Sequence, residues 1–548
     1  LMPNLSQLRR QKMLEFLSKI KEEHKDDDDT LIALGEIENE LTSKKYGLVW
    51  EKHEEAVDVK MKTHIPVFTE VKEREIVAAP GESYNFLLEG DNLHSLYLLE
   101  KTHKGKIDVI YIDPPYNTGH NDFIYEDKFV DSVDSFLHSK WCSFISERLS
   151  IAHRLLSDKG LIFISIDDNE YANLKLICDS IFGENNHVST CVWQKIHSIK
   201  NDAKYLSVNH DYILIYANKI DNIKIHLLER TVEMNARYKN PDNDPRGVWQ
   251  SGDLVANETR VNGNYDVIGP TGKVFNVPEG KHWVYSEDNM KELIADNRVW
   301  FGKTGTSFPR KKRFLTDVQQ GRTPDTWWKN EEVGHNQEGA RDLKKVLGRV
   351  VFNNPKPVRL IKRILEIGAY DNSVILDFFA GSGTTAQAVM EYNCSKKTHL
   401  KYIMCTNNEN NICNDVTYPR IKTVISGKRE DGGKYSDSMA ANLKYYRTDF
   451  VSRDEEFLAD ELLKHITEMI QLEHGVNIDD KQYVMVLSDE EADELQRHWN
   501  EYQDIKAIYI SRKVLLTTEQ NMLFGNTEIH IIPDDYFEFE LKEEGQAW

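Results

Sequence analysis

The alternation of apolar and polar positions predicts strands and helices in turn over most of the chain. From about residue 86, apolar runs of strand length (NFLLEGD, KIDVIYIDPPY and LIFISIDD) are separated by helical stretches, of which the longest covers 135–156. The same rhythm returns at SVILDFFAGSG, TTAQAVMEY and KYIMCTNNEN. Apolar strands that alternate with helices are typical of a parallel, doubly wound α/β sheet.

Three regions depart from this rhythm. Residues 5–24 have helical spacing and end at the acidic run HKDDDD, after which a second helix is predicted. Between 195 and 350, aromatic residues and Gly/Asn turns predict the short antiparallel strands of an inserted module. We therefore expect an N-terminal helical region (1–80), two halves of an α/β core (81–194 and 351–449) with the insert (195–350) between them, and a small C-terminal α/β domain (450–548).

Composition places the 548 residues among soluble globular proteins. Apolar residues make up 40% of the chain and no run of about 18 of them occurs, so no membrane span is expected. The six cysteines form no C-x-x-C pair, which predicts reduced, buried thiols in a cytoplasmic protein rather than disulfides or a zinc site. His197 and His210 lack metal-ligand spacing with any Cys or acidic residue, so no metal is expected.

Charge argues against general attraction to nucleic acid, with one local exception. The formal net charge is −21. Between Phe301 and Asn330, however, seven Lys/Arg face only two Asp. A basic segment in an acidic chain predicts a concentrated binding face for DNA. Its centre, with a solvated loop as the alternative interpretation, is the run Arg310, Lys311, Lys312 and Arg313.

The sequence Asp113-Pro114-Pro115-Tyr116 follows the apolar strand VIYI directly. An exocyclic amino nitrogen of a base is a poor nucleophile, because its lone pair is delocalised into the ring. A carboxylate and a backbone carbonyl that accept its two N–H bonds favour the tetrahedral nitrogen that can attack a sulfonium methyl group. The prolines stiffen the turn, and the aromatic ring can stack on a base drawn out of the duplex. A plain proline-rich turn after a buried strand is the alternative.

A second motif, DFFAGSGTT from Asp377 to Thr385, lies between a strand and a helix. Gly381 and Gly383 permit close backbone approach by a cofactor at the end of the strand. The dinucleotide fingerprint G-x-G-x-x-G and the phosphate-binding G-x-x-x-x-G-K-[ST] are both absent. The loop therefore suits S-adenosylmethionine, whose zwitterionic methionine end needs amide donors and a carboxylate, although a tight turn built for packing is the alternative.

Together these motifs resemble those of the amino-group DNA methyltransferases, in the circular permutation called the β class. There the catalytic motif precedes the cofactor loop and a target-recognition insert lies between them. The wider setting (LLEGDNLHSLYLLEK, GLIFISIDDNE, VTYPRI) is similar to the modification (Mod) subunits of type III restriction-modification systems over roughly residues 83–425. The resemblance implies a circularly permuted Rossmann-like sheet, with 81–194 as the catalytic half and 351–449 as the cofactor-binding half.

The resemblance also implies a role for each matching residue. The catalytic motif is matched by Asp113, Pro114, Pro115 and Tyr116. The cofactor loop is matched by Asp377, Phe379, Gly381, Ser382, Gly383 and Thr384.

Four further positions have assignments with alternatives. Asp91 would lie near the cofactor adenine or cap a helix. Asn407 would bind the ribose hydroxyls, with Asn408 and Glu409 as alternatives. Lys356, in NNPKPVRLIKRIL, would pair with the methionine carboxylate or lie at a surface turn. Trp193 would lie near the target base or in the core.

The implied activity is methyl transfer from S-adenosylmethionine to adenine N6 in double-stranded DNA, because Asp rather than Ser opens the catalytic motif. The implied partners are DNA, a second copy of the chain and a restriction (helicase-nuclease) subunit. Three alternatives stay open: a solitary methyltransferase, a recognition subunit that mainly guides a nuclease, and an enzyme that acts on RNA or on a protein glutamine.

Overall fold

The computed structural model describes residues 5–25, 27–42, 50, 53–119, 124–125, 128–129, 136–198, 203–478, 482–502 and 505–546. The chain divides into two compact units. Unit 1 comprises Leu1–Ile223, Trp328–Ile361 and Asp371–Trp548, and unit 2 comprises Lys224–Trp327 and Lys362–Tyr370.

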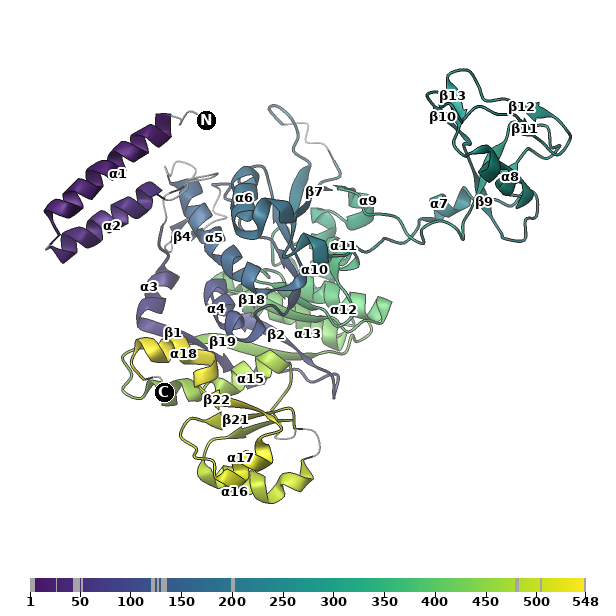
Figure 1. Cartoon of the computed structure of the whole chain (residues 1–548). Helices are drawn as coiled ribbons and strands as arrows, with labels where there is room; N and C mark the ends of the chain where they lie inside the picture. Colours follow the sequence, from purple (N-terminus) through teal and green to yellow (C-terminus); the bar gives the residue numbers. More distant parts are fainter. Residues whose placement is uncertain are drawn as a thin grey trace. The chain divides into compact units, whose positions relative to one another are not determined.

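A ten-stranded sheet forms the centre of unit 1 (Figure 1). Its order is β1 (His64–Glu70), β19 (Asn442–Ser452), β2 (Tyr84–Glu89), β18 (Lys401–Thr406), β17 (Val374–Asp377), β3 (Ile107–Ile112), β6 (Leu156–Ile166), β8 (His210–Ala217), β7 (His187–Gln194) and β16 (Trp327–Trp328). The strands from β19 to β6 run parallel, whereas β1, β8 and β7 pair antiparallel with their neighbours. The predicted parallel α/β sheet is thus confirmed, with antiparallel strands added toward both edges.

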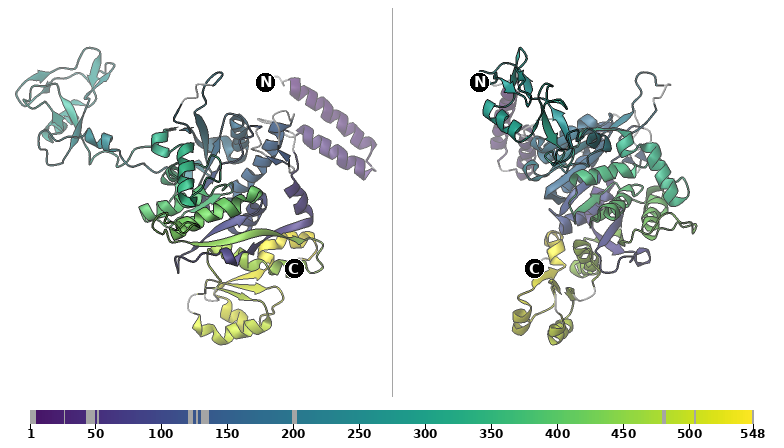
Figure 2. Two further views of the ribbon diagram at one scale, coloured as in Figure 1. Left: turned by 180° about the vertical axis from the view of Figure 1, so that it is seen from behind. Right: turned by 90° about the vertical axis from the view of Figure 1, so that its right-hand side faces the viewer.

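Helices cover both faces of this sheet, as Figures 1 and 2 show. Side chains of α4 (Asn92–His103), α5 (Leu137–Leu155) and α6 (Tyr171–Cys178) join one large core with alternate residues of the central strands. Helices α10 (Asn336–Leu347), α12 (Thr384–Lys396) and α13 (Tyr418–Ser426) pack together on the opposite face. Helix α11 (Val358–Gly368) begins in unit 1 and ends in unit 2. Because both faces are covered, β2 and β18 bury nearly every side chain, and this explains their continuous apolar sequences.

The ends of the chain in unit 1 are helical or α/β. Helices α1 (Leu5–Glu23) and α2 (Asp28–Thr42) pack on each other, and α3 (Ala56–Thr63) leads into β1. A second sheet of three parallel strands contains β20 (Tyr483–Val486), β21 (Ala507–Ser511) and β22 (Glu528–Ile532), with α16 (Asp489–His498) and α17 (Thr518–Phe524).

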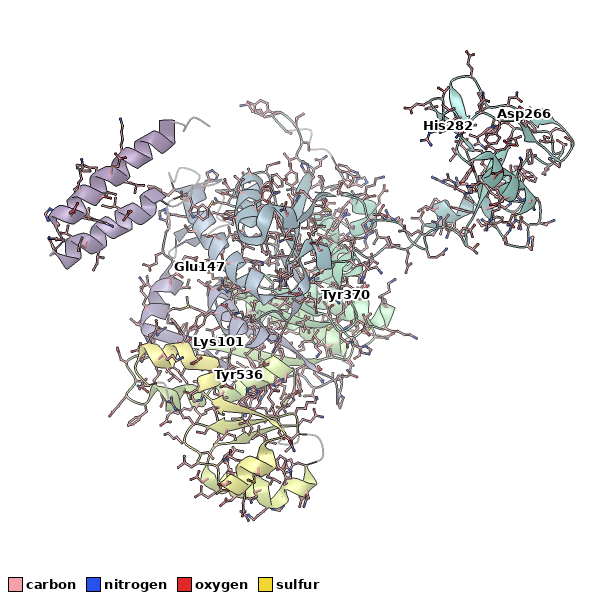
Figure 3. The ribbon with its side chains drawn as sticks, viewed as in Figure 1. Lys101, Glu147, Asp266, His282, Tyr370 and Tyr536 are labelled. Atoms are coloured by element: carbon pink, nitrogen blue, oxygen red, sulfur yellow. The ribbon has the colours of Figure 1, made fainter. Side chains whose placement is uncertain are left out.

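The helices α14 (Leu458–Leu463), α15 (Ile466–His474) and α18 (Asp534–Glu543) pack into the large core, so the predicted C-terminal α/β domain is continuous with it. Lys101 of α4 forms an ion pair with Glu540 of α18 at 2.5 Å, and Tyr536 donates to Glu473 at 2.7 Å. Lys101 and Tyr536 mark this junction in Figure 3.

Unit 2 consists of short antiparallel strands, as predicted for the insert. One small sheet contains β9 (Trp249–Gly252), β15 (Arg310–Phe314) and β14 (Val299–Trp300), and two strand pairs join β10 (Val255–Asn257) to β13 (Lys281–Trp283) and β11 (Val267–Ile268) to β12 (Val274–Phe275). Helices α7 (Val232–Ala236) and α8 (Glu287–Ala295) complete it, and Figure 3 labels Asp266 and His282 within it. Unit 2 differs from the predicted insert 195–350 in two ways. Strand β8 and helix α10 belong to unit 1, and Lys362–Tyr370, predicted as part of the cofactor-binding half, belongs to unit 2.

In the described ranges, no helix combines the length and the apolar character needed to cross a membrane. Five cysteines are buried as expected, but Cys394 is exposed.

Candidate active site

The strands that lead to Asp113 and Asp377 lie side by side. Strand β17 pairs in parallel with β3, with Ile375 opposite Val109 and Leu376 opposite Ile110. The loops after the two strands therefore open at the same edge of the sheet, outside the carboxyl ends of the strands, where doubly wound sheets bind their ligands. The fold thus brings together two motifs that lie far apart in the sequence.

The turn that contains Asp113 is held by its neighbours. The indole N–H of the buried Trp141 donates to the carbonyl oxygen of Pro115 at 2.8 Å. Asn117 ends the turn in the left-handed region (φ 58°) and donates to Glu170 at 2.5 Å. Burial and the adjacent Asp113 carboxylate raise the pKa of Tyr116 well above its ordinary value, so its ring stays a neutral phenol. The turn presents a carboxylate and an aromatic ring on a rigid frame.

Lys356 reaches this turn from the loop before α11. Its Nζ lies 2.6 Å from Asp113 Oδ2, 5.1 Å from the centre of the Tyr116 ring and 5.9 Å from that of Trp193. Thr384 donates to the carbonyl oxygen of Lys356 at 3.2 Å, which ties this loop to the cofactor loop. The ammonium is thus engaged by Asp113 in this structure, and its pairing with a methionine carboxylate stays a prediction.

Sequence reasoning missed a second carboxylate near this centre. Asp211 of β8 is buried and pairs with Lys195 at 2.5 Å. Its burial raises its pKa, and the Lys356 and Lys195 ammonium groups oppose that shift. No motif marks Asp211, because only the pairing of β8 with β6 brings it to this edge.

The cofactor loop after β17 is built around Asp377. The carboxylate accepts the backbone N–H of Phe379 at 3.0 Å and the hydroxyl of Thr385 at 2.6 Å. Full burial outweighs these bonds and raises the pKa of Asp377 to about 7. Gly381 (φ 48°) and Gly383 (φ 75°) both have left-handed backbone, as the glycine spacing predicts.

The loop is supported from below by α13. The fully buried Arg420 donates through Nη1 to the Ser382 carbonyl and hydroxyl oxygens, both at 3.1 Å, and to the Thr384 hydroxyl at 2.7 Å. Thr417 donates to the carbonyl oxygen of Gly381 at 2.6 Å. Arg420 and Thr417 lie in the sequence VTYPRI, which marked the resemblance but assigned them no role.

The neighbouring strand ends place the remaining predicted cofactor residues. Asp91 caps α4 by accepting the N–H of Leu93 at 2.8 Å, and the buried Arg148 lies 3.3 Å from it. The amide oxygen of Asn408 accepts two backbone N–H groups, from Cys413 and Asn414. Asn408 is therefore a turn cap, and the ribose role of Asn407 stays a prediction.

This donor set fits S-adenosylmethionine. The loop brings together a buried carboxylate, two glycines with left-handed backbone and two hydroxyls, at the edge where Asp113 lies. A Cβ added at Gly381 would meet the Phe352 ring and the Phe379 carbonyl oxygen at 3.7 Å, which is ordinary van der Waals contact, so the left-handed backbone rather than a lack of space favours glycine there. A zwitterionic methionine end requires such donors and a carboxylate, and no phosphate cradle is present in the sequence.

Two members of the predicted DNA-binding set are fully buried. Trp193 is fully buried and donates its indole N–H to the carbonyl of Gly334 at 2.9 Å, so it is a core residue that cannot stack on a base. Lys312 is also fully buried, and its ammonium pairs with Asp242 and Asp244. The prediction that Lys312 contacts DNA is wrong, because burial between two carboxylates withdraws its charge from the surface.

The rest of the basic run is partly exposed on β15. Arg310 pairs with Asp253, and Lys311 donates to the hydroxyl of Tyr285. Arg313 is exposed beside Gly252 of β9. Their contact with DNA stays a prediction.

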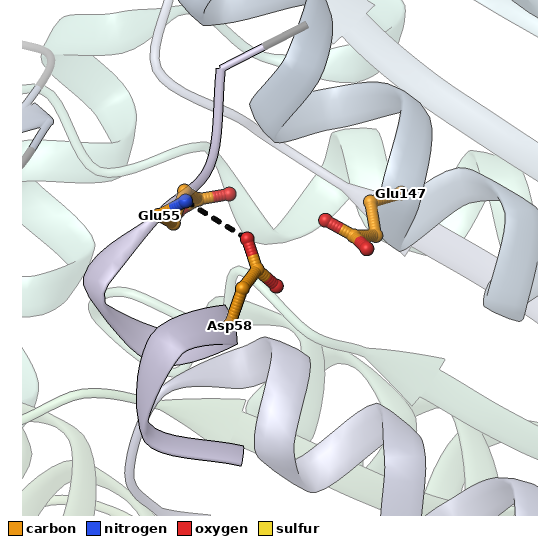
Figure 4. A group of neighbouring side chains, drawn as sticks. All are labelled: Glu55, Asp58 and Glu147. Atoms are coloured by element: carbon orange, nitrogen blue, oxygen red, sulfur yellow. Dashed lines mark hydrogen bonds between the residues drawn. The ribbon is translucent and has the colours of Figure 1, made fainter. Parts of the chain in front are cut away.

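An acidic cluster at the start of α3 is explained by local structure. Glu55, Asp58 and Glu147 bring carboxylate oxygens within 4.8 Å of one another (Figure 4). Asp58 accepts the backbone N–H of Glu55 at 2.8 Å in a helix capping box, and Glu55 pairs with Arg148 at 2.6 Å. We assign no metal to it.

Residues 107–416 match the N6/N4 methylase family, described as DNA methylase. The chain belongs to this family. It is 37% identical over 359 residues to the type III restriction-modification enzyme StyLTI Mod subunit of Salmonella typhimurium, a match that covers 61% of this chain and 54% of that protein. It is 31% identical over 386 residues to the type II methyltransferase M.KpnI of Klebsiella pneumoniae, covering 66% of this chain and 87% of that enzyme.

The match spans about half the length of the StyLTI Mod subunit. Among solved structures, the cytosine-N4-specific PvuII DNA methyltransferase aligns with 64% of this chain and 97% of its own, at 10% identity and a TM-score of 0.33. The family assignment rests on the sequence match, and the fold on the strand order described above.

Proposed function

We propose that the protein transfers a methyl group from S-adenosylmethionine to adenine N6 at a specific sequence in double-stranded DNA. The observation that carries the proposal is the parallel pairing of the strands before Asp113 and Asp377 in a chain of the N6/N4 DNA methylase family. When bound, S-adenosylmethionine supplies an electrophilic methyl group on a sulfonium. The two loops hold donor and acceptor in reach of each other, which converts a bimolecular encounter into a positioned one.

Within this proposal Asp113 accepts a hydrogen bond from the target amino group and favours its tetrahedral form. The Tyr116 ring stacks on the extruded base. The hydrogen bond from the Trp141 indole to the Pro115 carbonyl oxygen holds the turn in place. Lys356 occupies Oδ2 of Asp113, whereas Oδ1 is buried and has no hydrogen-bond partner among the described residues, so Oδ1 is the oxygen left to accept from the amino group.

We further propose that unit 2 reads DNA through one groove. A groove of about 520 Å³ is lined by the aromatic residues Trp249, Trp300 and Phe308 and by the cations Arg237, Lys239 and Arg310. Residues 224–327 carry sixteen Lys/Arg against fourteen Asp/Glu, so the acidity of the chain lies outside this stretch. Cations that line a groove match phosphates, and aromatic residues in the same groove can stack on bases.

The similarity to the StyLTI Mod subunit supports a role as the modification and recognition subunit of a type III restriction-modification system in the cytoplasm. A homodimer and a helicase-nuclease partner belong to that proposal. A solitary methyltransferase is the second candidate, because the chain also matches 87% of the type II enzyme M.KpnI. Cytosine N4 is the alternative target atom, because the family covers both chemistries.

One experiment tests the substrate class and the target atom. The purified full chain is incubated with isotopically labelled S-adenosylmethionine and random-sequence duplex DNA, RNA or protein, and the products are digested and analysed by mass spectrometry. We expect labelled N6-methyl-2′-deoxyadenosine from duplex DNA and no label in RNA or protein, and no labelled product from the Asp113→Ala variant. Label in N4-methyl-2′-deoxycytidine would identify cytosine N4 as the target atom instead of adenine N6. Label in RNA or protein alone would refute the proposal.

A further inference from the structure

Arg420 is a buried cation whose direct hydrogen-bond partners are all neutral. Its side chain is fully buried on α13, and its four hydrogen bonds comprise three to Ser382 and Thr384 and one from Nε to Gln387 at 2.8 Å. Within the described part of the chain, its Nη2 is buried with no hydrogen-bond partner. Burial lowers its pKa to about 10. A buried charge of this kind is costly, so its presence requires a reason.

A second buried arginine has its charge compensated by carboxylates, which is the usual arrangement for a buried charge. Arg148 is equally buried, but Glu55 lies 2.6 Å and Asp91 3.3 Å from it, and these carboxylates raise its pKa. Among the described residues, no carboxylate is in such contact with Arg420. The chain therefore pairs one buried guanidinium directly with its own carboxylates. The other, under the cofactor loop, has neutral direct partners, and the carboxylates of Asp342 and Glu391 act on it only through space, against the larger effect of burial on its pKa.

The hydroxyl groups of Ser382 and Thr384 connect Arg420 to the surface of the cofactor loop by hydrogen bonds. A hydroxyl oxygen that accepts from a guanidinium keeps its own proton for another acceptor. Thr384 gives its proton to the Lys356 carbonyl at 3.2 Å. The Ser382 hydroxyl lies 3.2 Å from Thr384, so its proton can turn to Thr384 or to an anion above the loop. Polarisation by Arg420 strengthens such a bond.

We propose that Arg420 is a positioning residue for the carboxylate of the cofactor's methionine end, acting through Ser382 and Thr384 and through its charge. Lys356, the cation that the sequence suggested for this role, is engaged by Asp113 instead. The inference rests on the proposed use of S-adenosylmethionine. A charge in a water-poor interior acts over several ångströms, so direct contact with the carboxylate is not required.

A comparison of the affinities for two ligands distinguishes this role from a purely structural one. S-adenosylhomocysteine contains the carboxylate, whereas 5′-methylthioadenosine lacks the whole amino-acid end. We expect Arg420→Gln to weaken binding of S-adenosylhomocysteine about tenfold, as for loss of one charge-assisted interaction, and to change binding of 5′-methylthioadenosine less than about twofold. Arg420→Lys, which keeps the charge, should recover part of the loss. Calorimetry on the full chain measures both ligands.

The matched control is Thr417→Val, which removes a neutral support of the same loop at Gly381. We expect it to alter the affinities for both ligands by the same factor. Equal weakening of both ligands by Arg420→Gln, or no change in either, would overturn the inference. If Arg420→Gln fails to fold, Ser382→Ala tests the same path and must weaken S-adenosylhomocysteine selectively. Failure of the unaltered protein to bind S-adenosylhomocysteine would instead refute the proposed cofactor.

Discussion

The ammonium of Lys356 lies 2.6 Å from the carboxylate of Asp113, although 243 positions separate the two residues in the chain. This ion pair joins the loop before α11 to the turn after β3, and Thr384 ties the same loop to the cofactor loop. The two sites of the proposed reaction are thus coupled through one short segment. The pair also places a cation where the amino group of a target base must approach.

Replacement of Lys356 distinguishes the two roles open to it. If the ammonium acts on Asp113, Lys356→Gln should lower turnover about tenfold or more and leave the affinity for S-adenosylhomocysteine unchanged, because only the acceptor carboxylate loses its partner. If it pairs with the methionine carboxylate, that affinity should fall instead. Single-turnover kinetics and calorimetry on the same preparation give both values.

Asp113→Ala should reduce methyl transfer by about 100-fold or more, because the carboxylate acts on the target nitrogen. Binding of S-adenosylhomocysteine should stay within about twofold. The control is Asp168→Asn, which alters an exposed carboxylate just beyond β6 that accepts the hydroxyl of Tyr212. Near-normal turnover in Asp113→Ala would contradict the proposed chemistry.

Asp377 predicts a pH dependence of cofactor affinity. With a pKa of about 7, its carboxylate is mostly protonated at pH 6 and mostly ionised at pH 8. An ionised Asp377 attracts the ammonium of the methionine end, so the affinity for S-adenosylhomocysteine should rise about tenfold over this range. Asp377→Asn should bind weakly and with a flat profile. Calorimetry at five pH values tests this.

The same shift has the opposite sign for the stability of the free protein. Because the folded-state pKa is raised above 3.8, the folded form retains a proton that the unfolded form has lost. The contribution of Asp377 to the free energy of unfolding is therefore full below pH 3.8 and is lost as the pH rises to about 7. In Asp377→Asn the free energy of unfolding should no longer decrease for this reason as the pH rises. Denaturant unfolding of both proteins at pH 5 and pH 8 measures the difference.

The groove of unit 2 predicts which cations bind DNA. The double variant Arg237→Ala/Lys239→Ala should weaken duplex binding, because each removed cation leaves one phosphate without its counter-charge. The slope of log affinity against log salt should then fall by about 0.9 per such phosphate. The control Lys281→Ala/Lys291→Ala removes two cations of unit 2 that do not line the groove. Equal effects of the two pairs would mean that only general charge matters.

Replacement of Lys312 should lower the stability of the protein and should not weaken DNA binding directly. Lys312→Met leaves the buried Asp244 and its neighbour Asp242 without this ammonium, and should destabilise the protein by about 3 kcal/mol. Exposed Arg313→Ala should change stability by less than about 0.5 kcal/mol. Thermal unfolding followed by tryptophan fluorescence compares them, because the Lys312 ammonium lies 5.6 Å from the Trp249 ring and 5.9 Å from the Trp300 ring. A stable Lys312→Met variant with weakened DNA binding would reverse this assignment.

The sequence by itself determined the parallel strands, the two motifs that follow β3 and β17, and the antiparallel character of the insert. These are local properties: strand length, apolar runs and glycine spacing depend on neighbouring residues. The helix predicted over 135–156 agrees closely with α5, because its periodicity is also local.

Tertiary structure alone decided which charges are available to a ligand. The run Arg310–Arg313 is uniform in sequence, but the side chains of a strand alternate between its two faces, so Lys312 is buried while Arg313 is exposed. Asp211 and Arg420 reach the site only through strand pairing and helix packing. Burial and ion pairing depend on residues far away in the sequence, so no local pattern could show that Lys356 pairs with Asp113 or that Arg420 lies under the cofactor loop with neutral hydrogen-bond partners.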